Sequence, residues 1–111
     1  MAPAGFDVEL TQGAEDDLEA IHSWLTDHRS PEEADALLDA FLDRVGTLEQ
    51  FPLRGSVPKE LDALGIREFR QILLEPYRMV YRVAGSKVFI LVIADGRRDM
   101  RTLLERRLLS R

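Results

Sequence analysis

The stretch EPYRMVYRVAGSKVFILVIADGRRD (residues 75–99) decides the fold, because it predicts two β-strands joined by a short Ala-Gly-Ser turn. In YRMVYRV (77–83) the aromatic and aliphatic side chains alternate with Arg78 and Arg82, so the two kinds occupy opposite faces of the strand. KVFILVIA (87–94) is apolar on both faces, which is typical of a central strand. The segment therefore predicts an antiparallel pair at the centre of a sheet.

The flanking sequence adds two strands. IREFRQILL (66–74) runs through Glu75-Pro76 into the first strand of the pair, which predicts a three-strand meander. FDVELT (6–11), near the N-terminus, alternates apolar and polar residues, as a half-buried strand does.

Two helices are predicted between these strands. QGAEDDLEAIHSWLTDH (12–28) carries apolar residues at helical spacing, with Thr11 or Gln12 at its start. SPEE (30–33) opens the second helix, because Ser30 is a good N-cap, proline fits the first turn and Glu33 completes a capping box. Pro52 ends this helix near Phe51. The short connection predicts an antiparallel helical hairpin.

The remaining segments complete an α+β fold in a single domain, 1–111. FPLRGSVPKELDALG (51–65) reads as an irregular connection with a helical turn around Lys59–Leu64. Asp99 caps a short C-terminal helix over 100–109. We expect an N-terminal strand, a helical hairpin packed on one face of a small, mainly antiparallel sheet, and a short C-terminal helix. The other face, with Arg78 and Arg82, is then covered only partly.

Charge is divided unevenly along the chain, whose net charge is −5. Residues 1–66 contain 15 acidic and 4 basic side chains, whereas residues 67–111 contain 5 acidic and 11 basic ones. Thirteen of the 15 basic residues are arginine, whose planar fork suits carboxylates and phosphates. The division favours either surface balancing for solubility or an anionic partner at the C-terminal half.

Composition also limits the protein's location and chemistry. The absence of cysteine excludes disulfides and thiolate chemistry. The N-terminus lacks the pattern of a signal peptide, and the longest apolar run, VFILVIA (88–94), is too short to span a bilayer. We expect a cytoplasmic protein that does not enter membranes.

The motifs FPLRG after a helical hairpin, GIREFRQILLEPYRMVYRV and VFILVIADGRRDMRTLL, in this order and spacing, resemble the RelE/ParE toxin superfamily, and the ParE branch more closely. The resemblance covers nearly the whole chain. It implies a bacterial toxin of a type II toxin–antitoxin module, of the kind also called plasmid stabilisation proteins, held inactive by an antitoxin encoded beside it. ParE-type members poison DNA gyrase, which makes gyrase the expected target. A homodimer and a toxin–antitoxin hetero-oligomer both remain open.

Two alternatives stay open. RelE-type members cut messenger RNA on the ribosome, and the resemblance places their arginine positions on Arg78 and Arg98. Their two lysines have no counterpart here, and the position of their catalytic tyrosine falls on Leu104. Whether the protein is an enzyme therefore remains open, although binding is favoured. The third possibility is a non-toxic family member that only forms a complex.

The candidate binding residues are five arginines and one tryptophan. We expect the arginines to gather in one cationic hollow that receives acidic antitoxin side chains and later a target surface: Arg70, Arg78, Arg82, Arg97 and Arg98. The alternative is a set of solvated arginines paired with Glu68, Glu75 or the acids of the antitoxin. Trp24 is expected to pack beside its helix, or to border the groove that the antitoxin uses.

Metal and cofactor chemistry is not predicted. Asp95 and Asp99 flank the Gly-Arg-Arg turn, and we expect them to pair with an arginine and to cap the last helix. His22 and His28 are six residues apart, so a helix points them in different directions, away from a shared zinc ion. They are expected at the surface or at a helix end.

Overall fold

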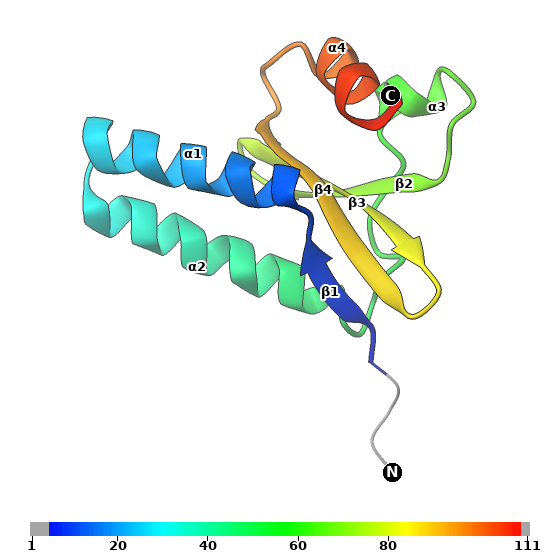
Figure 1. Ribbon diagram of the computed structural model, residues 1–111, viewed down its shortest axis with the longest axis horizontal. Coiled ribbons are helices and arrows are strands. Elements are labelled where there is room, and N and C mark those ends of the chain that lie inside the picture. The colour runs from blue at the N-terminus through cyan, green and yellow to red at the C-terminus, as the bar shows by residue number, and fades with distance from the viewer. Residues whose placement is uncertain (1–4, 110–111) are drawn as a thin grey trace.

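The computed structural model describes residues 5–109 and shows one four-stranded sheet flanked by helices (Figure 1). The strand order is β1 (Asp7–Leu10), β4 (Lys87–Asp95), β3 (Tyr77–Ala84) and β2 (Phe69–Leu74). β1 runs parallel to β4, and the other neighbours are antiparallel. This is the predicted α+β fold, with β4 inside the sheet as expected. The meander's first strand begins three residues later than predicted, at Phe69.

Helices α1 (Gln12–His28) and α2 (Pro31–Thr47) form the predicted hairpin, whose connecting end extends beyond the sheet (Figure 1). The Thr11 hydroxyl accepts a hydrogen bond from an amide of the first turn, and the Ser30 hydroxyl accepts one from the Glu33 amide. The predicted capping box is wrong in its second half, because the Glu33 carboxylate accepts from the Arg29 guanidinium instead. α2 ends at Thr47, before the position near Phe51 where Pro52 was predicted to end it.

The hairpin covers one face of the sheet and forms the larger core. The sheet contributes alternate residues of its strands to this core, and the helices contribute small and aromatic side chains: Ala14, Phe41, Leu48, Ile72, Met79, Tyr81, Val88, Ile90 and Ile93. The alternation in β4 shifts where the pairing with β3 slips between Val80 and Tyr81. The extra residue of this β-bulge changes which face of the sheet the following side chains of β4 point to, so apolar residues before and after the bulge are buried in a core.

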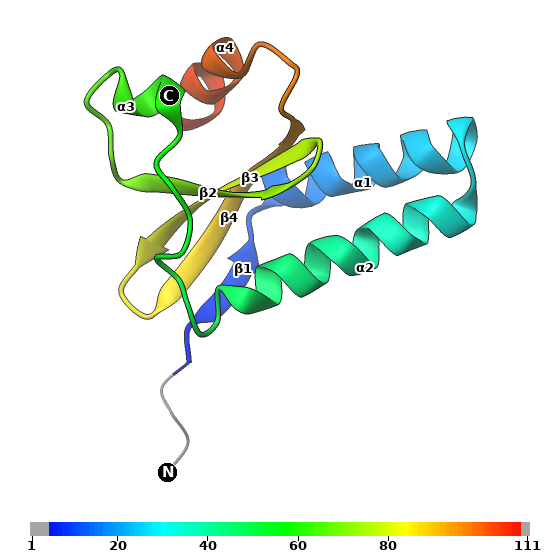
Figure 2. The ribbon, with the colours of Figure 1, turned by 180° about the vertical axis from the view of Figure 1, so that it is seen from behind.

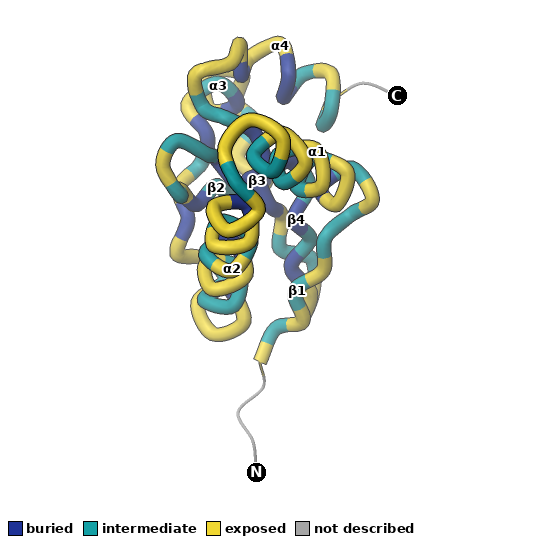
Figure 3. The backbone as a smooth tube through the Cα atoms, turned by 90° about the vertical axis from the view of Figure 1, so that its left-hand side faces the viewer, coloured by how far each residue is buried: buried dark blue, intermediate teal, exposed yellow. Residues whose placement is uncertain are grey.

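The other face of the sheet is also covered, contrary to the expectation of partial cover. α3 (Lys59–Asp62), α4 (Met100–Leu104) and the π-helical segment η1 (Glu105–Leu109) lie over it (Figure 2). Their leucines pack on residues from three strands in a second core: Leu61, Phe69, Val80, Val92, Ala94, Met100, Leu103 and Leu104. The burial-coloured tube shows buried backbone inside both layers (Figure 3). The loop helix α3 supplies the cover that periodicity alone does not reveal.

The β-bulge is tied to both helical layers by one ion pair. Arg107 of η1 donates to both carboxylate oxygens of Asp17, at 2.9 and 3.0 Å, and to the Leu91 carbonyl at 2.9 Å. Asp17 also accepts from the Ile93 amide at 3.0 Å. The pair therefore satisfies backbone groups beside the bulge. A Cβ at Gly13 would lie 2.7 Å from Nη2 of Arg107, so a larger residue at this position would push the guanidinium aside.

Tyr81 anchors the segment before α3 to the sheet. Its hydroxyl accepts from the Gly55 amide at 3.0 Å and donates to the Pro52 carbonyl at 2.7 Å. Burial of the ring raises the pKa of Tyr81. A Cβ on Gly55 would lie 2.5 Å from the Gln71 carbonyl oxygen, so this close approach also requires glycine.

Candidate functional site

The arginines divide into those with a partner and those without one. Of the twelve arginines within residues 5–109, nine donate a hydrogen bond to a side chain or a backbone carbonyl, and Arg82 forms an ion pair with Glu68. Within residues 5–109, the guanidinium groups of Arg98 and Arg106 have no hydrogen bond or ion pair, although the charge of Arg98 contributes to the lowered pKa of the Asp95 carboxyl. A guanidinium that is already neutralised attracts an anion much less than an open one. Among the described arginines, Arg98 and Arg106 are therefore the best candidates to bind an external anion.

Arg78 is buried and holds α3 onto the sheet. Its Nη1 and Nη2 donate to the two oxygens of Glu60 at 2.9 and 2.7 Å, and its Nε donates to Gln71 at 2.7 Å. The side chains of Arg78 and Glu60 are 11% and 13% exposed. The hydrogen bond from Arg78 lowers the pKa of the Glu60 carboxyl. The expected partners of Arg78, Glu68 and Glu75, are replaced by an acid from the loop helix.

Arg78 also supports the turn that carries the next two arginines. Its aliphatic stem packs so closely on Gly96 that a Cβ there would lie 2.9 Å from it. The Gly96 amide donates to the Pro76 carbonyl at 2.8 Å, which fixes the turn on the β2–β3 connection. Beside this stem is a hollow of about 560 Å³, the Arg78 hollow, lined by Ser56, Val57, Lys59, Gln71, Leu73, Glu75, Pro76, Tyr77, Arg78, Gly96 and Arg97.

Three polar residues in or beside the Arg78 hollow were not predicted from the sequence as site residues: two line it, and Glu60 is the ion-pair partner of Arg78. Lys59, Glu60 and Gln71 lie in or near the irregular connection and in an edge strand, and their local pattern carries no sign of the hollow. Their roles arise from the folding of α3 over the sheet, which depends on residues far apart in the chain.

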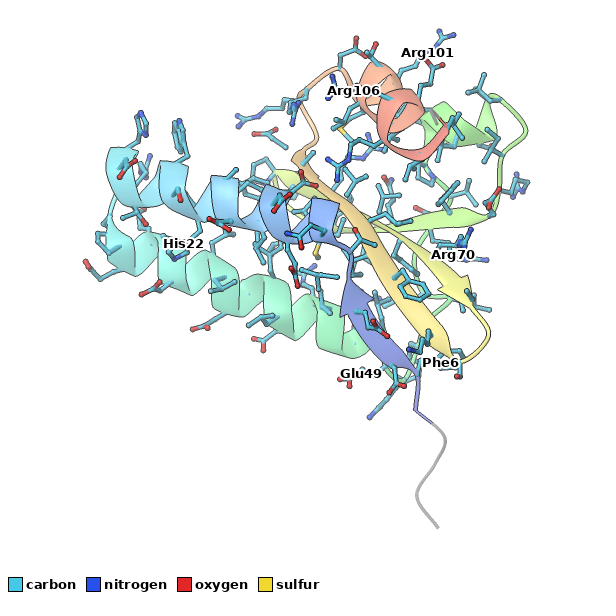
Figure 4. All side chains as sticks on the ribbon, viewed as in Figure 1. Phe6, His22, Glu49, Arg70, Arg101 and Arg106 are labelled. Carbon is cyan, nitrogen blue, oxygen red and sulfur yellow. The ribbon has the colours of Figure 1, made fainter. Side chains whose placement is uncertain are left out.

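Arg70 and Arg82 lie apart from this hollow. Arg70 is two residues before Ile72 and therefore lies on the same face of β2, the face that packs against the hairpin. Its guanidinium donates to the Leu53 and Gly55 carbonyls. Figure 4 shows Arg70 on the β2 side of the sheet, away from Arg101 and Arg106 on the C-terminal helix. Arg82 is exposed and lies 3.6 Å from Glu68. The five arginines are thus not gathered in one hollow.

Arg97 and Arg98 lie in the turn between β4 and α4. Arg97 donates to both oxygens of Asp95, at 2.9 and 2.5 Å, and this contact lowers the pKa of the Asp95 carboxyl. Asp99 caps α4 as predicted, with its carboxylate accepting from Thr102. Arg98 is exposed, and its own amide is fixed by the Asp95 carbonyl at 3.1 Å. The turn therefore holds one paired and one open guanidinium in a defined backbone.

Trp24 lies across a second hollow from these arginines. This hollow, the Arg98 hollow, has a volume of about 480 Å³ and is lined by Asp17, Ala20, Ile21, Trp24, Tyr77, Ile93, Ala94, Asp95, Arg97 and Arg98. Trp24 is 55% exposed and packs against another residue of its own helix. Its indole stacks on the His28 ring, with centroids 4.5 Å apart and planes at 10°. The structure thus brings together Trp24, Arg97 and Arg98 of the predicted residues.

The histidines are at the surface of the hairpin, as expected. The His22 Nε2 lies 2.9 Å from an Asp35 oxygen, which joins α1 to α2 (His22 is labelled in Figure 4). The His28 Nδ1 lies 2.9 Å from the Trp24 carbonyl. Among residues 5–109, acidic and histidine side chains do not gather in threes, as a protein metal site requires. Within the same residues, no helix has the length and apolarity to cross a membrane.

A third hollow is apolar and lies at the other end of the hairpin. It has a volume of about 790 Å³ and is lined by Phe6, Thr47, Phe51, Pro52, Leu53 and Arg54. Phe51 and Leu53 are 63% and 62% exposed. Phe6 and Glu49, which are joined by a backbone hydrogen bond of 2.8 Å, mark its position in Figure 4. Neighbouring exposed apolar side chains of this size are typical of an interaction surface.

Comparison with known proteins was informative for family and fold. Residues 8–100 match the profile of the ParE toxin of the type II toxin–antitoxin system, parDE. A solved structure described as the chromosomal ParDE toxin–antitoxin system from P. aeruginosa matches with a TM-score of 0.68. That match has 24% sequence identity and covers 81% of this chain and 95% of the other, so it supports a common fold. No curated protein sequence gives a significant match.

Proposed function

The chain belongs to the ParE toxin family of type II toxin–antitoxin systems, and from this premise we propose that it inhibits DNA gyrase by binding and is neutralised by a cognate antitoxin. The match over residues 8–100 is the observation that carries the toxin function. The gyrase target rests on the resemblance to ParE-type toxins. The proposal that the toxin acts by binding, and not as a ribonuclease, has separate support in the contacts of Arg78.

The engagement of Arg78 weighs against the ribonuclease alternative. Three of its N–H groups are committed to Glu60 and Gln71, and the side chain is almost fully buried. A residue that stabilises a phosphorane-like transition state must turn its donors toward the phosphate. To do so, Arg78 would abandon Glu60 in a buried position, which is strongly unfavourable. Arg78 therefore serves the fold, and Arg98 alone remains of the two arginine positions shared with RelE-type toxins.

We place the contact surface of the toxin at the Arg98 hollow. It combines an exposed tryptophan, an open arginine and an apolar floor. Tryptophan and arginine are enriched at the centre of protein interfaces, where they pack against apolar surface. Arg70 and Arg82 lie outside this surface and are assigned to carbonyl binding and to a surface ion pair.

The test is induction of the toxin without antitoxin, followed by two readouts in the same cells. The proposal expects arrested replication and stabilised gyrase–DNA breaks, with transcripts intact. Transcripts cleaved on the ribosome, with undamaged DNA, would replace it by the ribonuclease alternative. If folded toxin accumulates and neither effect appears, the protein is a complex-forming member without toxicity. Co-expression of the neighbouring antitoxin should restore growth in the first two cases.

A further inference from the structure

The segment that follows α2 displays two large apolar side chains to solvent. Phe51 and Leu53 are 63% and 62% exposed, the highest values for large apolar side chains among the described residues. Both belong to the apolar hollow of about 790 Å³ at this end of the hairpin. We call the residues that line it the Phe51 surface: Phe6, Thr47, Phe51, Pro52, Leu53 and Arg54.

The backbone of this segment is fixed by hydrogen bonds to its neighbours. The Leu53 carbonyl accepts from Arg70 at 3.2 Å, and the Pro52 carbonyl accepts from the Tyr81 hydroxyl at 2.7 Å. The Phe51 amide donates at 3.0 Å to the carbonyl of the last residue of α2. Because this backbone is ordered before any partner arrives, binding at the Phe51 surface loses little conformational entropy.

The rim of the Phe51 surface carries one open base and one open acid. The Arg54 guanidinium donates to the Thr47 hydroxyl at 2.7 Å, and this hydroxyl carries no charge. Glu49 is joined to Phe6 by a backbone hydrogen bond of 2.8 Å, so it lies beside the hollow (Figure 4). Within residues 5–109, neither Arg54 nor Glu49 forms an ion pair.

Glu49 also lies at the unfavourable end of a helix. A Cβ on Gly46 would lie 3.7 Å from a Glu49 carboxylate oxygen, so this carboxylate is at the C-terminal end of α2. That end of a helix carries the negative pole of the helix dipole and is stabilised by cations. A guanidinium from outside the chain is therefore attracted both by the carboxylate and by the helix end.

A second copy of the chain matches this surface in both shape and charge. A two-fold axis places one residue of the first copy against another residue of the second, and the reverse contact follows by symmetry. Hollows of about 300–1,000 Å³ hold drug-sized molecules, so a hollow of about 790 Å³ has room for the Phe51 side chain of a partner. A peptide of a single charge sign would satisfy one rim charge and be repelled by the other, whereas a second copy supplies both Arg54 and Glu49.

We infer that two copies of the chain associate through their Phe51 surfaces as a two-fold dimer, with Phe51 of each copy in the hollow of the other and Arg54 of each copy bound to Glu49 of the other. This dimer does not depend on the proposed function. Its apolar centre is small, which places it at the low end of specific interfaces, about 1,200 Å² in total, where complexes are weak and transient. The dimer therefore forms and dissociates with protein concentration.

Sedimentation velocity of the full-length protein, purified without antitoxin, measures this association. The protein is compared at concentrations from about 5 to about 500 μM, a range suited to weak complexes. We expect the sedimentation coefficient to rise from that of a monomer toward that of a dimer. Phe51→Glu should weaken dimerisation about thirtyfold or more, because it removes the aromatic side chain at the centre of the interface.

Leu64→Glu is the matched control. It also replaces an exposed apolar side chain by an acid, and Leu64 follows α3, which covers the opposite face of the sheet (Figure 2). It should change the dissociation constant less than about twofold, as surface substitutions away from a contact do. Circular dichroism of each variant establishes that it is folded.

Exchange of the rim charges tests the two-fold contact directly. Glu49→Arg and Arg54→Glu each place like charges together at both contacts, and each should weaken dimerisation about tenfold. An equimolar mixture of these two variants restores opposite charges at both contacts. The mixture should therefore associate about as tightly as the parent protein.

Three results would overturn the inference. The first is a parent protein that stays monomeric at the highest concentration, and the second is a Phe51→Glu variant that dimerises normally. The third is a mixture of Glu49→Arg and Arg54→Glu that associates no more tightly than either variant alone. If the parent protein is monomeric and Phe51→Glu abolishes binding of the antitoxin encoded beside it, the Phe51 surface belongs to the antitoxin. The proposed function is tested separately, by growth arrest and gyrase–DNA breaks in cells.

Discussion

The ion pair between Arg78 and Glu60 gives the sharpest prediction for stability. Arg78→Met removes the guanidinium and keeps much of the stem that packs on Gly96, so the Glu60 carboxylate remains in a site where it is 13% exposed. Removal of one partner from a buried pair costs about 3–5 kcal/mol. Because both side chains keep some contact with water, we expect the lower end, about 3 kcal/mol.

This loss is large for a chain of 111 residues. A domain of this size has a free energy of unfolding of about 6–16 kcal/mol, and each kcal/mol lost lowers the melting temperature by about 4 °C. Arg78→Met should therefore melt about 12 °C below the parent protein. Urea unfolding followed by far-ultraviolet circular dichroism measures the same loss directly, since the exposed Trp24 is a poor reporter of the core.

Arg82→Met is the control, because Arg82 lies on the same strand and on the same side of the sheet. It removes a surface contact of 3.6 Å in which both side chains are exposed, and it should cost less than about 1 kcal/mol. The double variant Arg78→Met with Glu60→Leu replaces the whole pair by apolar groups and should be more stable than Arg78→Met alone. Equal losses for the two methionine variants, or additive losses in the double variant, would refute the argument.

Three further predictions concern other tertiary contacts. Since the pKa of Glu60 is lowered in the folded protein, its contribution is present above the unfolded pKa of about 4.3 and is lost as pH falls through the folded value, so Glu60→Gln should flatten the acid limb of a stability–pH curve. Tyr81→Phe should cost about 1–3 kcal/mol in urea unfolding, because two backbone groups lose the hydroxyl that bridges them. Asp17→Ala should accelerate hydrogen exchange of the Ile93 amide and loosen Arg107, because both donate to the Asp17 carboxylate. Asp16→Ala, at the neighbouring exposed aspartate, should do neither.

The element order was predictable because each element carries a local signal. Alternation marked the strands, the cap residues Thr11, Ser30 and Asp99 marked helix starts, and continuous apolarity marked β4 as internal. The cover on the second sheet face was not predictable from periodicity. α3 spans four residues, too few to show a helical repeat, and it reaches the sheet through Leu61 and Glu60.

The candidate site was predictable only in part, for the same reason. The sequence shows which residues are arginines, but a guanidinium binds an external anion only if the fold leaves it open. Arg78 and Arg98 are alike in sequence terms, since the resemblance to the superfamily places both at its arginine positions. The fold gives Arg78 a buried carboxylate 18 residues away in sequence, whereas among the described residues no carboxylate forms an ion pair with the Arg98 guanidinium.

Burial of the two sheet faces limits where this protein can bind a partner. Both broad faces of the sheet are occupied by the hairpin and by the C-terminal helices, so an incoming chain meets rims and helix grooves and not an open sheet. The Arg98 hollow is such a groove, because it lies where α1 leaves the ends of β3 and β4. Arg78 fixes one wall through Gly96, and the Asp17–Arg107 pair fixes the other through α1. The buried ion pairs therefore act as supports that keep a single open guanidinium and an exposed indole at a constant separation, which is the condition for a short peptide segment to recognise both at once.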